Sequence, residues 1–234
     1  MKRTAFVFPD QDVLKVGTGK DLCMNFKTAN SLFYEADQET GKKLTRLCFE
    51  GPQEELNAQE NQKAALVTCE LAGLASILEI APYVMEDVAY VIGYGVGFYP
   101  ALAAAGTMDL SWSIRLAFLH SQKEVSSSWE DVLSNIHLSA PDIPILGCQS
   151  AELLKTPEDV RKELSAEPFK SHQQCQKMIR FLKEEGVDLI VQFGADDDLG
   201  FWTKEVDPSI EVVALHDERA VRVFADYFMQ IRSL

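Results

Sequence analysis

The segment VIGYGVGFYPALAAAG, residues 91–106, decides the fold class. A hydrophobic run ends at Gly93, a short turn carries Gly95 and Gly97, and an alanine-rich stretch of helical composition follows. This order predicts a strand that turns sharply into a helix. Further β-rich runs are separated by segments of helical periodicity. With the strand before the turn, the predicted strands are 4–8, 88–93, 143–146, 188–193 and 211–215. The alternation predicts an α/β fold with a mostly parallel sheet flanked by helices.

Two helix boundaries are also marked in the sequence. Thr156, Pro157 and Asp159 have the order of an N-cap, a first-turn proline and the partner residue of a capping box. Gly186 follows an amphipathic stretch and predicts a helix C-terminus directly before a strand. No repeat, low-complexity tract or linker interrupts the chain, so we expect a single domain over residues 1–234.

Composition and charge exclude several classes of protein. The chain has 234 residues, 47% of them hydrophobic and 25% charged, which is typical of a globular domain. A formal net charge of −14 disfavours nucleic acids and anionic membranes as partners. No apolar stretch is long enough to cross a bilayer, and a cytoplasmic location is the expectation. Five scattered cysteines without a CxxC motif predict neither disulfides nor a zinc site, and no cofactor or metal is expected.

The central residue of the turn is unusual for this type of elbow. In the pattern G-x-S-x-G, a serine stands between the glycines and carries the reacting oxygen. The elbow holds that residue at positive φ, which costs a side chain with a Cβ about 1–3 kcal/mol. Here the position is Gly95, and glycine relieves that strain. Gly93 and Gly97 are expected to remain because the turn and the strand-to-helix packing leave no room for a Cβ.

Four stretches of the chain resemble one enzyme family in the family's own order. They are AFVFPDQDVLKVGTGKDL at 5–22, LCFEGPQEELNAQENQKAAL at 47–66, GYGVGFYPALAAAG at 93–106 and MIRFLKEEGVDLIVQFGADDDLGFWTK at 178–204. The family is that of the malonyl-CoA:acyl carrier protein transacylases and the acyltransferase domains of polyketide synthases. The resemblance covers nearly the whole chain and implies the large, hydrolase-like subdomain of that fold.

The resemblance implies that most catalytic positions are altered. The family's nucleophilic serine corresponds to Gly95, the histidine before it to Tyr94, and a following glutamate to Phe98. The arginine that holds the malonate carboxylate corresponds to His120, which lacks arginine's two-pronged geometry. Gln11 keeps the position that helps to form the oxyanion hole. On this basis no catalytic residue is assigned.

A second departure concerns the small ferredoxin-like subdomain, which supplies the FHS histidine base in the family. Here SIRLAFLHSQ is followed almost at once by a stretch that resembles the resumed large subdomain, so the small subdomain is expected to be deleted near 122–125. FLHS at 118–121 imitates FHS. The ungapped match of the preceding helix nevertheless favours His120 as the arginine's counterpart over the alternative that it is the base.

Acidic residues replace small ones in two loops of the resemblance. Asp10 and Asp12 stand where the family has glycines, and 196–198 is an aspartate run in the late loop. We expect a solvated acidic rim. The alternative is a cation site, because oxygen-rich clusters suit magnesium or calcium.

These losses predict that the chain is not an enzyme but an inactive decoy acyltransferase. It would serve as a docking or scaffold module in polyketide or fatty-acid biosynthesis. The alternatives are a divergent thioester hydrolase or acyltransferase with an altered mechanism, and an acyl-CoA sensor. The candidate interface is Tyr94, Phe98, Tyr99 and Trp112, since exposed aromatic patches are typical of interfaces. The other interpretation is that these rings fill the vacated pocket.

The expected partner is a protein of a polyketide or fatty-acid synthase system, such as a ketosynthase-linked segment. Residues 91–110 contain no Lys or Arg, and the whole chain is strongly acidic. Carrier proteins are typically acidic as well, so we expect weak or no binding of a carrier protein.

Overall fold

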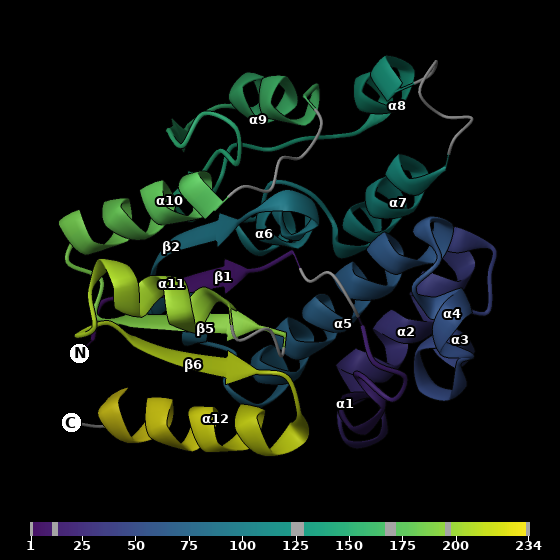
Figure 1. The fold of residues 1–234 in the computed structure, drawn as a ribbon, viewed down its shortest axis with the longest axis horizontal. Helices are drawn as coiled ribbons and strands as arrows, with labels where there is room; N and C mark the ends of the chain where they lie inside the picture. The colour runs from purple at the N-terminus through teal and green to yellow at the C-terminus, as the bar shows by residue number, and fades with distance from the viewer. Residues whose placement is uncertain (1, 11–13, 123–128, 167–171, 195–197, 233–234) are drawn as a thin grey trace.

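A computed structural model describes residues 2–10, 14–122, 129–166, 172–194 and 198–232. Six strands form one sheet in the order β4-β3-β2-β1-β5-β6 (Figure 1). Neighbouring strands run parallel except β3 and β4, which are antiparallel. The strands are β1 Thr4–Phe8, β2 Val88–Gly93, β3 Ile145–Leu146, β4 Leu153–Leu154, β5 Leu189–Phe193 and β6 Glu211–Leu215. The predicted α/β class with a mostly parallel sheet is confirmed.

Most predicted elements are confirmed, with two differences in the third strand region. The run at 143–146 pairs only over Ile145–Leu146, and β4 was not predicted because two residues are too few to give an alternating pattern. The capping box at Thr156 is present, with the Asp159 N–H donating to Thr156 Oγ1 at 3.1 Å. Gly186, two residues after the end of α10, has φ +73°, as expected of a C-terminal glycine.

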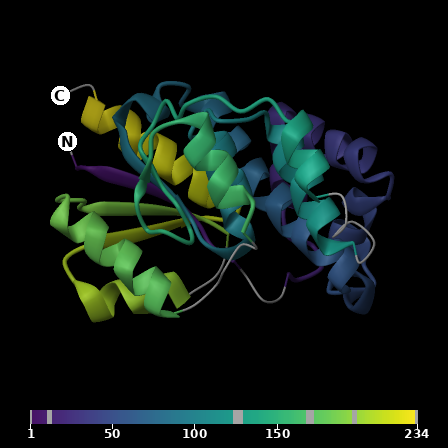
Figure 2. The ribbon, with the colours of Figure 1, turned by 90° about the horizontal axis from the view of Figure 1, so that it is seen from above.

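Helices cover both faces of the sheet. Figure 2 shows α10 (His172–Glu184) and α11 (Asp198–Val206) on one face and α12 (Glu218–Arg232) on the other. The long α5 (Gln59–Ile80) packs beside α12 and against β5. Because both faces are covered, the central strands are apolar on both sides, and Ala5 to Phe8 are all buried.

A group of helices, here called the helical lobe, lies beyond the carboxyl ends of the strands (Figure 1). It consists of α1 (Lys20–Asn25), α2 (Lys27–Thr40), α3 (Leu44–Glu50), α4 (Gln53–Leu56) and α7 (Leu110–Ser121), packed around the first half of α5. The remaining helical elements are η1 (Val84–Asp87), η2 (Gly95–Gly97), α6 (Phe98–Ala104), α8 (Trp129–Asn135) and α9 (Pro157–Leu164).

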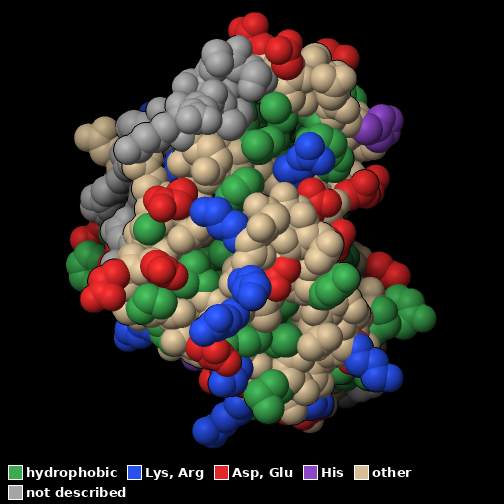
Figure 3. All heavy atoms as spheres, turned by 90° about the vertical axis from the view of Figure 1, so that its right-hand side faces the viewer, with side chains coloured by type: hydrophobic (Ala, Val, Ile, Leu, Met, Phe, Trp, Pro, Cys, Tyr) green, Lys and Arg blue, Asp and Glu red, His purple; other side chains and the backbone are tan. Residues whose placement is uncertain are grey.

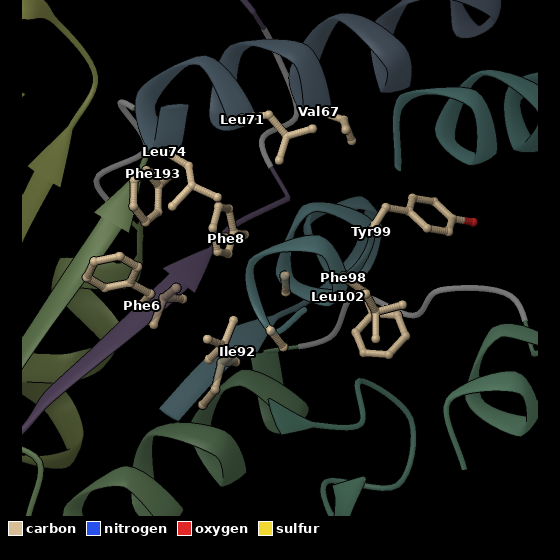
Figure 4. Close-up of a cluster of buried hydrophobic side chains, with 14 of the residues drawn as sticks. Phe6, Phe8, Val67, Leu71, Leu74, Ile92, Phe98, Tyr99, Leu102 and Phe193 are labelled. Atoms are coloured by element: carbon tan, nitrogen blue, oxygen red, sulfur yellow. The ribbon is translucent and has the colours of Figure 1, made fainter. Parts of the chain in front are cut away.

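The core alternates between the two faces of the sheet. Phe6 and Phe8 point toward α5 and pack on Phe193, with ring centroids 5.1 and 4.6 Å apart (Figure 4). Leu71 and Leu74 of α5 close this cluster from above. These apolar contacts hold the carboxyl ends of β1, β2 and β5 together, which is where the elbow lies.

α7 of the helical lobe ends at Ser121, and α8 begins at Trp129. All strands within the described ranges belong to one sheet. The His120 ring in α7 lies 5.4 Å from the Trp129 ring in α8, so the elements on either side of residues 123–128 are in contact. The expected deletion near 122–125 extends into residues outside the described ranges, and it stays a prediction. Within those ranges no helix combines the length and hydropathy needed to cross a bilayer.

Candidate functional site: an elbow without a serine

The elbow lies at the carboxyl edge of the sheet and faces the helical lobe (Figure 1). β2 ends at Gly93, a 3-10 turn covers Gly95–Gly97, and α6 begins at Phe98. In open α/β sheets, ligands bind outside the carboxyl ends of the strands. The elbow is therefore the candidate functional site.

The two flanking glycines are fixed by close backbone contacts. A Cβ on Gly93 would lie 2.2 Å from the carbonyl oxygen of Gly97. A Cβ on Gly97 would lie 2.1 Å from the carbonyl oxygen of Phe8 in β1. Both distances are far inside van der Waals contact, and both involve backbone atoms that cannot move aside. The expectation that packing retains these glycines is confirmed.

Gly95 adopts the left-handed conformation expected of an elbow, with φ +55°. A Cβ built on it would lie 2.0 Å from Oδ2 and 2.6 Å from Cγ of Asp10. The Asp10 side chain thus occupies the space that a side chain on residue 95 would need. Asp10 follows β1 and is half-buried. The elbow therefore presents a carboxylate from the neighbouring strand where a serine would stand.

This contact was missed at the sequence level, where Asp10 was assigned to an acidic rim or a cation site. Asp12, Asp196 and Asp197 lie outside the described residues, as does Gln11. Among the residues that are described, no group of three or more His, Cys, Asp and Glu side chains could hold a metal ion. The contact with Gly95 is thus the one that the described residues show for Asp10, and the cation site stays a prediction.

Three of the four candidate interface residues lie in the core. Tyr94 is 1% exposed, and Phe98 and Tyr99 are fully buried, so they form no exposed patch. The sequence pattern did not distinguish an exposed aromatic group from rings packed around the elbow, and the second arrangement is the one found. Trp112 in α7 is half-buried, with the Arg115 guanidinium 4.9 Å from its ring centroid.

His120, which the resemblance matches to the family's arginine, lies half-buried on α7. Its Nδ1 is 2.5 Å from the Tyr99 hydroxyl, which joins α7 to the helix that follows the elbow. The Trp129 ring lies at a tilt beside the imidazole, with an interplanar angle of 53°. This hydrogen bond and the ring contact fix the orientation of the imidazole, and a single ring cannot offer the paired donors of a guanidinium.

Thiols near the helical lobe do not replace the missing serine. Cys69 in α5 is 8% exposed and contacts Cys48, which is fully buried. The hydrogen bond with Cys48 and burial raise the pKa of the Cys69 thiol well above its usual range. Because the thiolate is the reactive form, this thiol stays protonated and unreactive.

Cationic side chains on the helical lobe come from elements outside residues 91–110. Lys42 donates to Asn61 Oδ1 at 2.7 Å, and its Nζ lies 5.5 Å from the Phe118 ring centroid. Arg115 lies 3.9 Å from Glu39. Figure 3, which views the molecule from the side of the helical lobe, shows Lys and Arg side chains interspersed with Asp and Glu. The segment 91–110 lacks Lys and Arg, but the surface of the neighbouring helical lobe carries both.

The fold is that of the malonyltransferases. The chain superposes on the acyl-carrier-protein S-malonyltransferase of Bartonella henselae with a TM-score of 0.84 and 19% identity, covering 96% of this chain and 99% of the other. The enzyme from Burkholderia pseudomallei gives 0.86 and 15% identity, with 96% and 99% covered. A third neighbour, with a TM-score of 0.79 and 17% identity, is a malonyl-transacylase in complex with a type II polyketide synthase acyl carrier protein; 96% of this chain and 99% of that one are covered.

Sequence comparison finds transacylases among the relatives of the chain. The chain is 38% identical over 109 residues to the malonyl CoA-acyl carrier protein transacylase of Bacillus subtilis (strain 168), covering 47% of this chain and 33% of that protein. It is 33% identical over 119 residues to the Haemophilus influenzae enzyme, covering 51% and 38%. The chain thus aligns with little more than a third of the length of these curated relatives. No family model matches it.

The comparisons contradict the prediction that the chain is not an enzyme. The relatives and structural neighbours described above are named as transacylases or malonyltransferases, which are enzymes. The prediction gave too much weight to Gly95 and His120, because it treated the loss of the family's residues as the loss of chemistry. It had not considered the carboxylate that the fold brings to the elbow.

Proposed function

We propose that the chain acts on acyl thioesters in carrier-protein-dependent fatty-acid or polyketide synthesis, as an acyltransferase-fold enzyme that works without a serine at its elbow. The observation that carries this proposal is the Asp10 carboxylate in the space of a residue-95 side chain. The relatives' names supply the thioester class. Among the mechanisms that the sequence left open, this is the acyltransferase or hydrolase with an altered mechanism.

The chemistry of the elbow supports this choice. A glycine has no group that can attack a carbonyl or take up a proton, whereas a carboxylate can do either. Asp10 is half-buried at the carboxyl edge of the sheet, which is where ligands bind in open α/β sheets. The tight packing at Gly93 and Gly97 holds the backbone around this carboxylate in one place.

We further propose an acyl carrier protein as the partner, as in the neighbour that is complexed with one. Lys42 and Arg115 on the helical lobe provide positive charge for an acidic partner, despite the net charge of −14. The weak carrier binding expected from residues 91–110 has no support from the comparisons. Titration of a carrier protein against the wild type and Arg115→Glu decides between the two expectations.

A docking role in a synthase is the second candidate. The pair of Trp112 and Arg115 favours it, because Trp and Arg are the residue types most enriched among the strongest contacts of protein interfaces. This role no longer draws on Tyr94, Phe98 or Tyr99, which are buried.

Release of CoA tests the proposal. The full chain is incubated with malonyl-CoA or acetyl-CoA, with and without a holo-carrier protein, and free CoA and acylated carrier are measured. CoA release above the uncatalysed rate supports the proposed function. No release from either thioester, together with binding of a synthase protein that Trp112→Ala abolishes, would establish the docking role in its place.

A further inference from the structure

The geometry points to Asp10 as the catalytic nucleophile, forming a covalent acyl-aspartyl anhydride; this assignment rests on the proposed function. In a G-x-S-x-G elbow, the turn holds the reacting oxygen at the carboxyl edge of the sheet. Oδ2 of Asp10 is 2.0 Å from the ideal Cβ position on residue 95. A reactive oxygen is thus present at the elbow, and it belongs to Asp10 after β1 instead of to a residue of the turn.

The fold contains a second contact of the same shape, which provides a control. Gly106 has φ +80°, and a Cβ on it would lie 2.4 Å from Oδ2 of Asp142. A carboxylate packed over a left-handed glycine is therefore not by itself a sign of catalysis. The two differ in location: Asp142 is exposed in a loop, whereas Asp10 is half-buried at the carboxyl edge of the sheet beside the elbow.

The proposed reaction balances without any added redox agent. A carboxylate oxygen of Asp10 attacks the thioester carbonyl carbon, a C–O bond forms, and the C–S bond breaks. The thiolate of CoA leaves and takes a proton from solvent. The thiol of the carrier protein, as thiolate, or a water molecule then attacks the acyl carbon of the anhydride. The acyl group moves to the acceptor, and Asp10 is released as the carboxylate.

The anhydride is expected to be short-lived. A side-chain carboxyl has an unperturbed pKa of about 3.9 and a thiol of about 8.5, so the carboxylate is the much better leaving group. The equilibrium of the first step therefore favours the thioester. An acyl adduct will not accumulate, and the intermediate has to be trapped as it forms.

Trapping with hydroxylamine gives the direct test. The full chain turns over acetyl-CoA in the presence of hydroxylamine, and the peptide that contains residue 10 is analysed by mass spectrometry. The fraction of hydroxylamine that attacks Cγ of Asp10, instead of the acyl carbon, leaves a stable hydroxamate on Asp10 that accumulates over many turnovers. We expect this hydroxamate in the wild type and in Asp142→Asn. We expect none in Asp10→Asn, which keeps the size of the side chain and loses the nucleophile. CoA release should fall about 100-fold or more in Asp10→Asn and remain unchanged in Asp142→Asn.

Isotope labelling separates a nucleophile from a base or a structural group. Over many turnovers in ¹⁸O-labelled water, each attack of water on Cγ of Asp10, instead of on the acyl carbon, leaves label in the Asp10 carboxylate, so label accumulates there. Many turnovers by the wild type that leave neither label nor hydroxamate on Asp10 overturn the assignment and leave the proposed function standing. No turnover by the wild type overturns both.

A second variant keeps the test decisive if Asp10→Asn folds poorly. Asp10→Glu retains the carboxylate one methylene further along and should still form the hydroxamate, at a reduced rate. A folded Asp10→Asn, judged by its circular dichroism and unfolding midpoint, that releases CoA at the wild-type rate would overturn the assignment.

Discussion

The two ends of strands β1 and β2 are held in opposite ways. At the carboxyl edge, Gly97 packs on the backbone of Phe8 and Asp10 covers Gly95, with separations that leave no room for another atom. At the amino edge, Tyr90 donates to Glu185 at 2.6 Å, and the Arg3 and Glu185 side chains are 48% and 42% exposed. The same strands thus end in a tightly packed backbone turn on one side and in solvated polar contacts on the other.

The two edges differ in how well they should tolerate substitution. Backbone packing restricts the residues at the carboxyl edge, whereas the exposed side chains at the amino edge can change. A clash between backbone atoms can be relieved only by moving a strand, whereas an exposed ion pair contributes about 0–1 kcal/mol and is screened by salt. We therefore expect the sheet to depend on the carboxyl edge for its stability, although more charged groups meet at the amino edge.

The largest effect is expected for Gly97→Ala. The new Cβ would lie 2.1 Å from Phe8 O and 2.6 Å from Phe8 C, so β1 and α6 would have to separate. The free energy of unfolding in urea should fall by more than about 4 kcal/mol, or the variant should not fold. Gly200→Ala is the control, because nothing lies within 4 Å of that Cβ position in α11. If the unfolding free energy of Gly97→Ala lay within about 1 kcal/mol of the wild-type value, as expected for the control, the comparison of the two edges would be wrong.

An intermediate effect is expected for Gly95→Ser. A side chain at φ +55° is strained and meets the Asp10 carboxylate, which is flexible enough to shift, so we expect a loss of about 1–3 kcal/mol in unfolding free energy. Combining Gly95→Ser with Asp10→Gly should recover part of that loss, and a double-mutant cycle measures the coupling. Serine-dependent acyl transfer should not appear in Gly95→Ser, since one restored member of a catalytic unit gains little. Additive effects in the cycle would show that the two residues do not share this space.

A smaller effect is expected for Tyr90→Phe at the amino edge. The hydrogen bond to Glu185 raises the pKa of the Tyr90 hydroxyl. Its contribution, about 1 kcal/mol, is complete below the unfolded pKa of about 10 and is lost as pH rises through the folded value. The difference in unfolding free energy between wild type and Tyr90→Phe should therefore shrink above that pH. Tyr34→Phe, at a position 68% exposed, should show no such difference at any pH.

The smallest effect is expected for Glu211→Gln, which removes the ion pair with Lys2. The two side chains are 51% and 40% exposed. The free energy of unfolding should change by less than about 0.5 kcal/mol, and by less still in 1 M salt. A loss comparable to that of Gly95→Ser would mean that the amino edge is held as firmly as the carboxyl edge.

Local patterns in the sequence were enough to predict most helices and strands and the position of the elbow. The strand at 88–93, the capping box at Thr156 and the roles of Gly93 and Gly97 follow from residues close together in the chain, and the structure has them as predicted. The strand β4 has only two residues, which is too short to show an alternating pattern in the sequence.

Tertiary contacts account for what the sequence could not provide. Asp10 meets Gly95 only because β1 and β2 pair in parallel and end at the same edge. Tyr94, Phe98 and Tyr99 are buried because α6 packs against α5 and α7. The spacing of apolar residues within α6 does not specify this packing. The link between Tyr99 and His120 likewise joins two helices whose contact no local pattern encodes.

The central claim is that the elbow works through the carboxylate of Asp10 and not through residue 95. Its most direct test is the rate of CoA release from acetyl-CoA by the wild type, Asp10→Asn and Asp142→Asn at equal concentrations of folded protein. We predict release by the wild type and Asp142→Asn, and a rate that is lower by about 100-fold or more in Asp10→Asn. Equal release by all three proteins, or no release by the wild type, would contradict the claim.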